Sequence, residues 1–330
     1  MTGPDGRHGT GPARLDVEGV VVTFGGVQAV DGADLSAEPG SIVGLIGPNG
    51  SGKTTMLDVI SGLVAPRSGS LRLDGESLVE YLPEERATLG VVRSFQDCRL
   101  FPELRVEEVL LLTEDARRPV GVLSATLRTP WARRSERSKQ EEVDRVIQSF
   151  GIERFRNHQI AELSTGTRRV VDLASIVLAH PRLLLLDEPT AGIAQREAEA
   201  FVPLLRRLHT LADTTIVLVE HDVPLVFALC SKVVMMETGR VVSSGTPDEV
   251  GRDPRALAAY LGASEEALAV SGALPGALPG VPAGAALPGG PPSGGFPHGA
   301  SRATLPGSIL PDDLPDEPSP RGSGGNAAHS

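Results

Sequence analysis

The segment Gly47 to Thr54 constrains the fold of this chain most, because its sequence, GPNGSGKT, is rich in glycine and ends on a lysine and a threonine. A short apolar run, Ile42 to Ile46, comes directly before it, and the apolar residues between Lys53 and Ile60 recur at helical spacing. Such a run is typical of a strand buried on both faces. A strand, a glycine-rich loop and a helix in this order predict a phosphate-binding loop, in which backbone N–H groups surround phosphate oxygens at the start of the helix.

Side chains suited to nucleotide chemistry occur in this loop and after a second apolar run. The Lys53 ammonium is expected to reach the β- and γ-phosphates of ATP, and the Thr54 hydroxyl is expected to ligate Mg²⁺. The run Leu183 to Leu186 leads to Asp187, whose carboxylate suits the hydration shell of the same ion. Glu188 follows in a position to take a proton from attacking water. The predicted nucleotide-binding residues of the loop are Gly47, Pro48, Asn49, Gly50, Ser51, Gly52, Lys53, Thr54 and Thr55.

Strand-like and helix-like segments alternate along the chain, which predicts an α/β fold with a mainly parallel sheet. The stretch Pro66 to Gly75 is rich in turn-forming residues, and no helix or strand is predicted within it. Helical patterns cover Lys53 to Ile60, Arg133 to Gln148, a segment beginning near Ser164, and Pro247 to Leu261. The predicted strands are Leu15 to Phe24, Val27 to Leu35, Ile42 to Ile46, Val91 to Phe95, Leu183 to Leu186, Thr214 to Val219, and a hairpin of Lys232 to Met236 with Arg240 to Val242.

The domain organisation follows from changes in composition. Residues 1–14 are polar and glycine-rich and predict a flexible N-terminus, and residues 15–262 predict one nucleotide-binding domain. Charged, helix-like sequence from about 103 to 180 predicts a helical subdomain inserted into its core. Residues 263–330 are expected to form a disordered tail, because roughly two-fifths of its sequence is Pro plus Gly without a collagen repeat.

Composition also narrows the setting. The formal net charge of −11 is the wrong sign for a nucleic-acid surface, so no nucleic-acid partner is expected. The two cysteines, Cys98 and Cys230, lack disulfide or metal spacing and fit a reducing compartment. The N-terminus does not have the pattern of a signal peptide, and no run of about 18 apolar residues occurs. Work at a membrane would therefore need a second chain that supplies the span.

Five motifs in order resemble the ATP-binding-cassette (ABC) ATPases. They are the phosphate loop, Gln96, the segment Leu163-Ser164-Thr165-Gly166, the segment Asp187-Glu188-Pro189-Thr190, and the segment Val219-Glu220-His221-Asp222. The resemblance covers roughly Leu15 to Gly262. It implies a P-loop NTPase core of the ABC type, with an antiparallel β subdomain and an inserted helical subdomain.

The resemblance assigns further roles. Gln96 matches the glutamine that senses Mg²⁺ and the γ-phosphate, and His221 matches the histidine that contacts the γ-phosphate and steadies the attacking water. Phe24 matches the aromatic residue, usually tyrosine, that stacks on adenine. Ser164, Thr165 and Gly166 match the signature that holds the γ-phosphate bound by a second subunit, which implies a head-to-tail dimer of identical or related ATPases.

Two residues depart from the family pattern. Thr167 stands where the family usually has Gln or Glu after the signature glycine. Ala194 stands where the loop after Pro189 and Thr190 usually has Asp or Asn. In the family, the residue at the position of Ala194 helps to couple the two nucleotide sites. The absence of Asp or Asn there therefore bears on communication between the sites more than on binding or hydrolysis.

A narrower resemblance concerns the solute. The sequence resembles the ATPases of branched-chain amino acid importers at three places: Phe95-Gln96, the segment Arg99 to Leu104, and the C-terminal end of the domain from Gly245 to Gly262. This implies a cytoplasmic protein on the inner face of the cell membrane, bound to permease subunits and served indirectly by a substrate-binding protein. ATPases for urea, short amides or lipopolysaccharide share much of this pattern.

Two readings outside transport stay open at the level of sequence. A soluble ABC protein acting on DNA or ribosomes would usually carry two cassettes or a long coiled-coil insertion, and the sequence has no second phosphate loop. A nucleotide-binding regulator without useful turnover is the other reading, suggested by Thr167 and Ala194.

Overall fold

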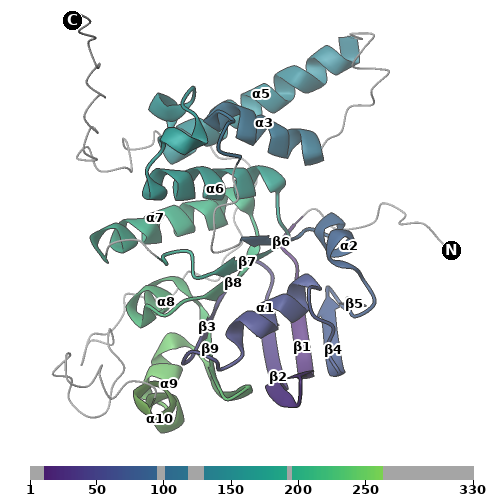
Figure 1. Cartoon of the computed structure of the whole chain (residues 1–330), viewed down its shortest axis with the longest axis vertical. Coiled ribbons are helices and arrows are strands. Elements are labelled where there is room, and N and C mark those ends of the chain that lie inside the picture. The colour runs from purple at the N-terminus through teal and green to yellow at the C-terminus, as the bar shows by residue number, and fades with distance from the viewer. Residues whose placement is uncertain (1–10, 95–100, 118–129, 192–194, 263–330) are drawn as a thin grey trace, which may run out of the picture.

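The computed structural model describes residues 11–94, 101–117, 130–191 and 195–262 (Figure 1). The helices are α1 (Lys53–Ser61), α2 (Pro83–Thr88), α3 (Val106–Arg117), α5 (Pro130–Phe150), α6 (Thr165–Ala179), α7 (Gln195–Ala212), α8 (Val223–Leu229), α9 (Pro247–Arg252) and α10 (Pro254–Gly262). The strands are β1 (Leu15–Phe24), β2 (Val27–Ala37), β3 (Ile42–Ile46), β4 (Ser68–Leu73), β5 (Glu76–Ser77), β6 (Val91–Ser94), β7 (Leu183–Asp187), β8 (Thr215–Val219), β9 (Lys232–Glu237) and β10 (Arg240–Gly245).

A six-stranded sheet forms the centre of the molecule, in the order β10-β9-β3-β8-β7-β6. Its strands pair in parallel except for β10, which forms an antiparallel hairpin with β9. Every residue of β3, β7 and β8 is buried, as expected of strands covered on both faces. Because the strands are parallel, the carboxyl ends of β3, β7 and β8 meet at one edge, and the loops that follow them lie together.

An antiparallel sheet, β2-β1-β4-β5, packs against α1 and completes a second core. Residues of β1 alternate in burial, because one face of this sheet meets the helix and the other faces solvent. The turn between β1 and β2 is made by Gly25 and Gly26, both at positive φ. Strand β4 lies within the turn-rich stretch Pro66 to Gly75, where the sequence predicted no strand, and it pairs with β1 from Val21↔Ser68 to Leu15↔Leu73. Its few apolar residues gave a weak strand signal, and pairing across the sheet decided its conformation.

Helices α3, α5 and α6 form the helical part of the molecule, and α3 and α5 lie at the end opposite the antiparallel sheet (Figure 1). The predicted solvated helix is confirmed as α5, whose buried apolar side chains, Val143, Val146, Ile147 and Phe150, recur at helical spacing. Short 3-10 turns, Glu153–Phe155 and Ile160–Glu162, connect α5 to α6. The expected antiparallel and helical subdomains are therefore present around an α/β core.

Element ends differ from the sequence predictions by small amounts. Strand β2 runs to Ala37, β8 begins at Thr215, and the closing helical segment divides into α9 and α10 at Asp253. Within residues 11–14, placed in the predicted flexible N-terminus, Ala13 is buried and its N–H donates to Arg182 O at 3.1 Å. None of the helices in the described ranges is both long and apolar enough to cross a membrane.

Candidate nucleotide site

The phosphate loop leaves β3 and enters α1 through glycines that no other residue could replace without strain. Gly47, Gly50 and Gly52 have φ values of 149°, 77° and 103°. A Cβ at Gly47 would lie 2.1 Å from Met236 O, and one at Gly52 would lie 2.5 Å from Ala29 O. The loop is therefore pressed against its neighbours, which leaves its N–H groups and the start of α1 to face a ligand.

Lys53 is held inside this loop. Its ammonium donates to Gly47 O and to Pro48 O, each at 2.8 Å, and the residue is 5% exposed. Burial lowers the pKa of the Lys53 ammonium, and the nearby charges of Glu188 and Asp187 oppose that shift. The buried Ser51 Oγ has no hydrogen-bond partner within the described residues. An ammonium and an unsatisfied hydroxyl in one loop suit phosphate oxygens, so the residues present fit a nucleotide.

Asp187 ends β7 and is 3% exposed. Its Oδ2 accepts a hydrogen bond from Arg93 Nη2 at 2.9 Å, while its buried Oδ1 has no partner in the described part of the chain. Buried carboxylate oxygens are normally satisfied, and oxygen ligands are those that Mg²⁺ prefers. Thr54, in the first turn of α1, is exposed and supplies a hydroxyl. These two residues fit the predicted metal ligands.

Glu188 and His221 meet across neighbouring strands. Each follows the end of its strand, β7 and β8, which pair in parallel with Asp187 opposite Val219. Glu188 Oε1 lies 2.7 Å from His221 Nε2, and the side chains are 22% and 44% exposed. The Glu188 backbone has a φ of 47°, unusual for a residue with a side chain, and its N–H donates to Val219 O at 2.9 Å. A reachable carboxylate paired with an imidazole is an arrangement that can accept and steady a proton.

Two buried charged residues, to which the sequence analysis assigned no role, hold this arrangement. The Glu220 carboxylate accepts hydrogen bonds from Thr190 N and Thr190 Oγ1, at 2.9 and 2.6 Å, and from His221 N at 3.1 Å. Arg169, on α6, donates to Pro189 O at 2.9 Å and to Glu188 O at 3.2 Å. The sequence carried one signal for Glu220, a charge directly after a buried strand, but no local pattern identified its partners.

The signature segment lies at the start of α6. Ser164 is the N-cap, and its Oγ accepts from Thr167 N at 3.2 Å and lies 3.0 Å from Thr167 Oγ1. Thr167, which stands where the family usually has Gln or Glu, is buried and donates its N–H to this cap. Ser164 and Thr165 are exposed, and Gly166 is half-buried. Among the described residues, no hydrogen bond joins this segment to the phosphate loop of the same chain.

Of the remaining predicted positions, some lie within the described residues and others do not. Phe24, at the end of β1, is 50% exposed and so presents its ring to solvent. Gln96 and Ala194 lie outside the described residues, as does Cys98. Cys230 is buried, which raises the pKa of its thiol to about 12. The structure thus brings together Lys53, Asp187, Glu188 and His221.

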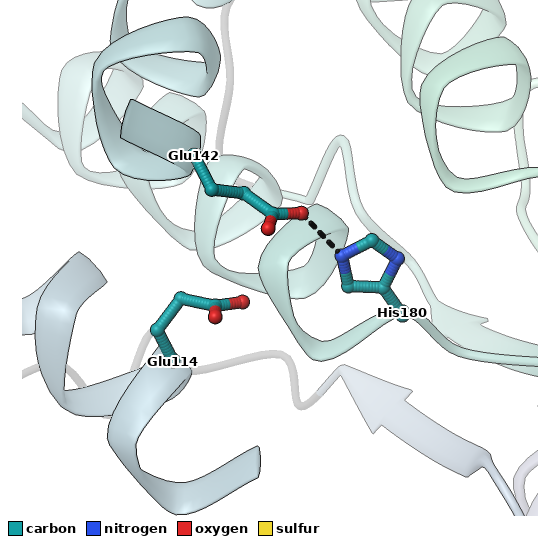
Figure 2. A group of neighbouring side chains, drawn as sticks. All are labelled: Glu114, Glu142 and His180. Carbon is teal, nitrogen blue, oxygen red and sulfur yellow. Dashed lines mark hydrogen bonds and ion pairs between the residues drawn. The ribbon is translucent and has the colours of Figure 1, made fainter. Parts of the chain in front are cut away.

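A second cluster of titratable side chains, Glu114, Glu142 and His180, lies among the helices (Figure 2). Glu142 Oε1 is 2.7 Å from His180 Nε2, and Glu114 is fully buried. Arg117 Nη2 lies 2.9 Å from Glu114 Oε1 and 3.7 Å from Glu142 Oε2. Because a guanidinium already supplies positive charge to both carboxylates, the cluster is explained as an ion-pair contact that joins α3, α5 and the end of α6.

Comparisons with known proteins agree with this geometry. Residues 30–191 match the family described as ABC transporter, and residues 240–266 match the family described as branched-chain amino acid ATP-binding cassette transporter. The high-affinity branched-chain amino acid transport ATP-binding protein BraF of Pseudomonas aeruginosa is 35% identical over 248 residues, which cover 75% of this chain and 97% of BraF. The high-affinity branched-chain amino acid transport ATP-binding protein LivG of Escherichia coli is 34% identical over 248 residues, which cover 75% of this chain and 97% of LivG.

Solved structures show the same similarity. An ATP-binding cassette of an ABC transporter in its ADP conformation is 26% identical, with a TM-score of 0.64, and the match covers 76% of this chain and 99% of that one. A nucleotide-free cassette of an ABC transporter is 24% identical, with a TM-score of 0.62, and covers 75% of this chain and 98% of that one. The second likeness shows the fold alone.

Proposed function

This chain belongs to the ATP-binding, ATP-hydrolysing subunits of ABC transporters, and we propose that it powers the import of branched-chain amino acids through a separate membrane permease. The observation that carries the solute class is the match of residues 240–266 to the branched-chain amino acid cassette family, beyond the general ABC match. BraF and LivG, which match nearly end to end, are named for the same transport. A related small polar solute, such as urea or a short amide, is the alternative for the same subunit.

In the proposed hydrolysis, Glu188 accepts the proton of the attacking water, and His221, 2.7 Å away, holds that carboxylate in position. Lys53 and the loop N–H groups bind the β- and γ-phosphates, and Phe24 offers an exposed ring for adenine. Asp187 and Thr54, with Gln96, are the residues proposed to hold Mg²⁺. The bound ion would neutralise charge that develops on the phosphate oxygens.

The exposed signature segment supports a site completed by a second subunit. Ser164 and Thr165 begin a helix of 15 residues whose N-terminus attracts negative charge, yet no hydrogen bond of the described residues joins them to the phosphate loop of their own chain. We place the γ-phosphate held by a second ATPase subunit, identical or related, against this helix start. The assembly would lie on the inner face of the cell membrane, with permease subunits bound to it and a substrate-binding protein reached through them.

The chemical role of Glu188 is tested by phosphate release from purified Glu188→Gln protein. Loss of a general base costs on the order of a hundredfold or more in turnover, while ATP binding is retained. Glu84→Gln, which neutralises an exposed carboxylate on α2, is the matched control and should keep parental turnover. Near-parental turnover of Glu188→Gln would remove Glu188 as the base.

The solute is tested separately, in cells that lack this chain. Uptake of labelled leucine, isoleucine and valine should fall, and the parental chain but not Glu188→Gln should restore it. Unchanged leucine uptake together with reduced uptake of labelled urea or acetamide would reject the branched-chain assignment and favour the alternative.

A further inference from the structure

Arg93 connects the helix of the phosphate loop to the candidate metal ligand. It lies on β6, the edge strand of the central sheet, and its side chain is 8% exposed. Its Nη1 donates to Asp58 Oδ1 on α1 at 2.5 Å, and its Nη2 donates to Asp187 Oδ2 on β7 at 2.9 Å. Three elements that come from different parts of the sequence therefore meet through one guanidinium.

This contact divides the two oxygens of the Asp187 carboxylate. Oδ2 is taken by Arg93, and the buried Oδ1 has no hydrogen-bond partner within the part of the chain that the structure describes. A buried polar atom without a partner is costly, so Oδ1 is the oxygen with most to gain from a cation or its bound water. A guanidinium is planar and donates in fixed directions, so it constrains how the carboxylate is turned.

We propose that Arg93 is a positioning residue for Mg²⁺, which fixes the Asp187 carboxylate so that Oδ1 is the oxygen presented to the ion. The inference rests on the metal role of Asp187 set out under the proposed function. Asp58 anchors the other end of the guanidinium on α1, with Ser61 Oγ 3.4 Å from Nη1. The orientation of the metal ligand is thereby tied to the helix that begins at the phosphate loop.

Competition between Arg93 and the metal ion would have the opposite effect on metal affinity. If the guanidinium competed with the ion for Asp187, removal of Arg93 would strengthen metal binding. The structure favours positioning, because Arg93 occupies only one carboxylate oxygen and has a second anchor in Asp58, which is 27% exposed. A competitor would need to leave a buried, doubly paired position each time the ion binds.

The test measures binding of Mn²⁺, a spectroscopic substitute for Mg²⁺, to the full-length protein with ADP present, by the loss of the free-ion electron paramagnetic resonance signal. Arg93→Gln should weaken Mn²⁺ binding by about tenfold or more, as loss of a group that orients a metal ligand usually does. Arg93→Lys, which keeps the charge and loses the planar fork, should fall between. ADP affinity in excess chelator should change by less than about twofold in each variant, which also verifies the fold.

Arg182→Gln is the matched control, because Arg182 is a half-buried arginine that precedes β7 at its other end and forms an ion pair with the exposed Asp74. It should leave Mn²⁺ affinity unchanged. Unchanged or tighter Mn²⁺ binding in Arg93→Gln, while Asp187→Asn weakens it, would overturn the role of Arg93 alone. Unchanged binding in Asp187→Asn would overturn the metal role of Asp187 and this inference with it.

Discussion

Removal of the Arg86 guanidinium should destabilise the protein, because this group contacts the C-terminal end of α1, the helix that begins at the phosphate loop. Arg86 lies on α2 and is 2% exposed, and burial lowers the pKa of its guanidinium. Its Nη1 donates to Val59 O and Ile60 O in the last turn of α1, at 2.5 and 2.9 Å, and its Nε donates to Tyr81 O at 3.0 Å. One side chain therefore caps the C-terminus of α1 and fastens α2 to it.

The size of the effect follows from the acceptors left behind in Arg86→Met. Val59 O keeps the N–H of Gly62, at 3.2 Å, whereas Ile60 O and Tyr81 O lose this donor. Each orphaned carbonyl costs roughly 1–3 kcal/mol, and the lost cation at a helix C-terminus adds roughly 0.3–1 kcal/mol. Removing a buried charge recovers part of this sum, so the free energy of unfolding should fall by about 3 kcal/mol.

Urea unfolding followed by circular dichroism measures this change in the midpoint and slope. Arg86→Lys, which keeps the charge but fewer donors, should lose about half as much. Arg252→Met, an exposed arginine in the last turn of α9, should stay within about 0.5 kcal/mol of the parent. Because the start of α1 is untouched, ADP affinity of folded Arg86→Met should change by less than about twofold. A loss no larger than that of Arg252→Met would refute the capping argument.

Two further predictions concern a half-buried carboxyl group and a core glycine. Burial raises the pKa of Asp172, on α6, from 3.8 to about 6, so its contribution to stability is greatest below pH 3.8 and is lost as pH rises through 6. Asp172→Asn should therefore raise the free energy of unfolding at pH 8 by about 2 kcal/mol, and this gain should shrink from pH 6 towards pH 4. Urea midpoints measured over a pH series test this, and an equal gain at every pH would contradict it. Gly44→Ala would place a Cβ 2.4 Å from Val226 Cγ1 in the core and should cost about 1–3 kcal/mol, while Gly11→Ala, with open space around it, should not; thermal melting of both variants decides the matter.

The sequence by itself determined the local parts of the nucleotide site. The glycine spacing of the phosphate loop, the buried runs of β3 and β7, and the acidic pair after β7 are each properties of a few consecutive residues. The structure has strand, loop and helix at these places because each element is specified by its own apolar period and turn residues. The family resemblance added His221, which no local pattern would have selected.

Only the tertiary structure decided which side chains meet. The contact between Arg93 and Asp187 joins residues 94 positions apart, and those of Glu220 with Thr190 join residues 30 apart. Sequence patterns give the burial of a strand but not its neighbours, so the order that places β8 between β3 and β7 was not predictable from them. Parallel pairing brings the ends of distant strands to one edge, and the buried charges there must then find partners. For that physical reason Asp187, which the sequence shows only as an acidic residue after an apolar run, has in the fold one carboxylate oxygen paired with Arg93 and the other without a hydrogen-bond partner among the described residues.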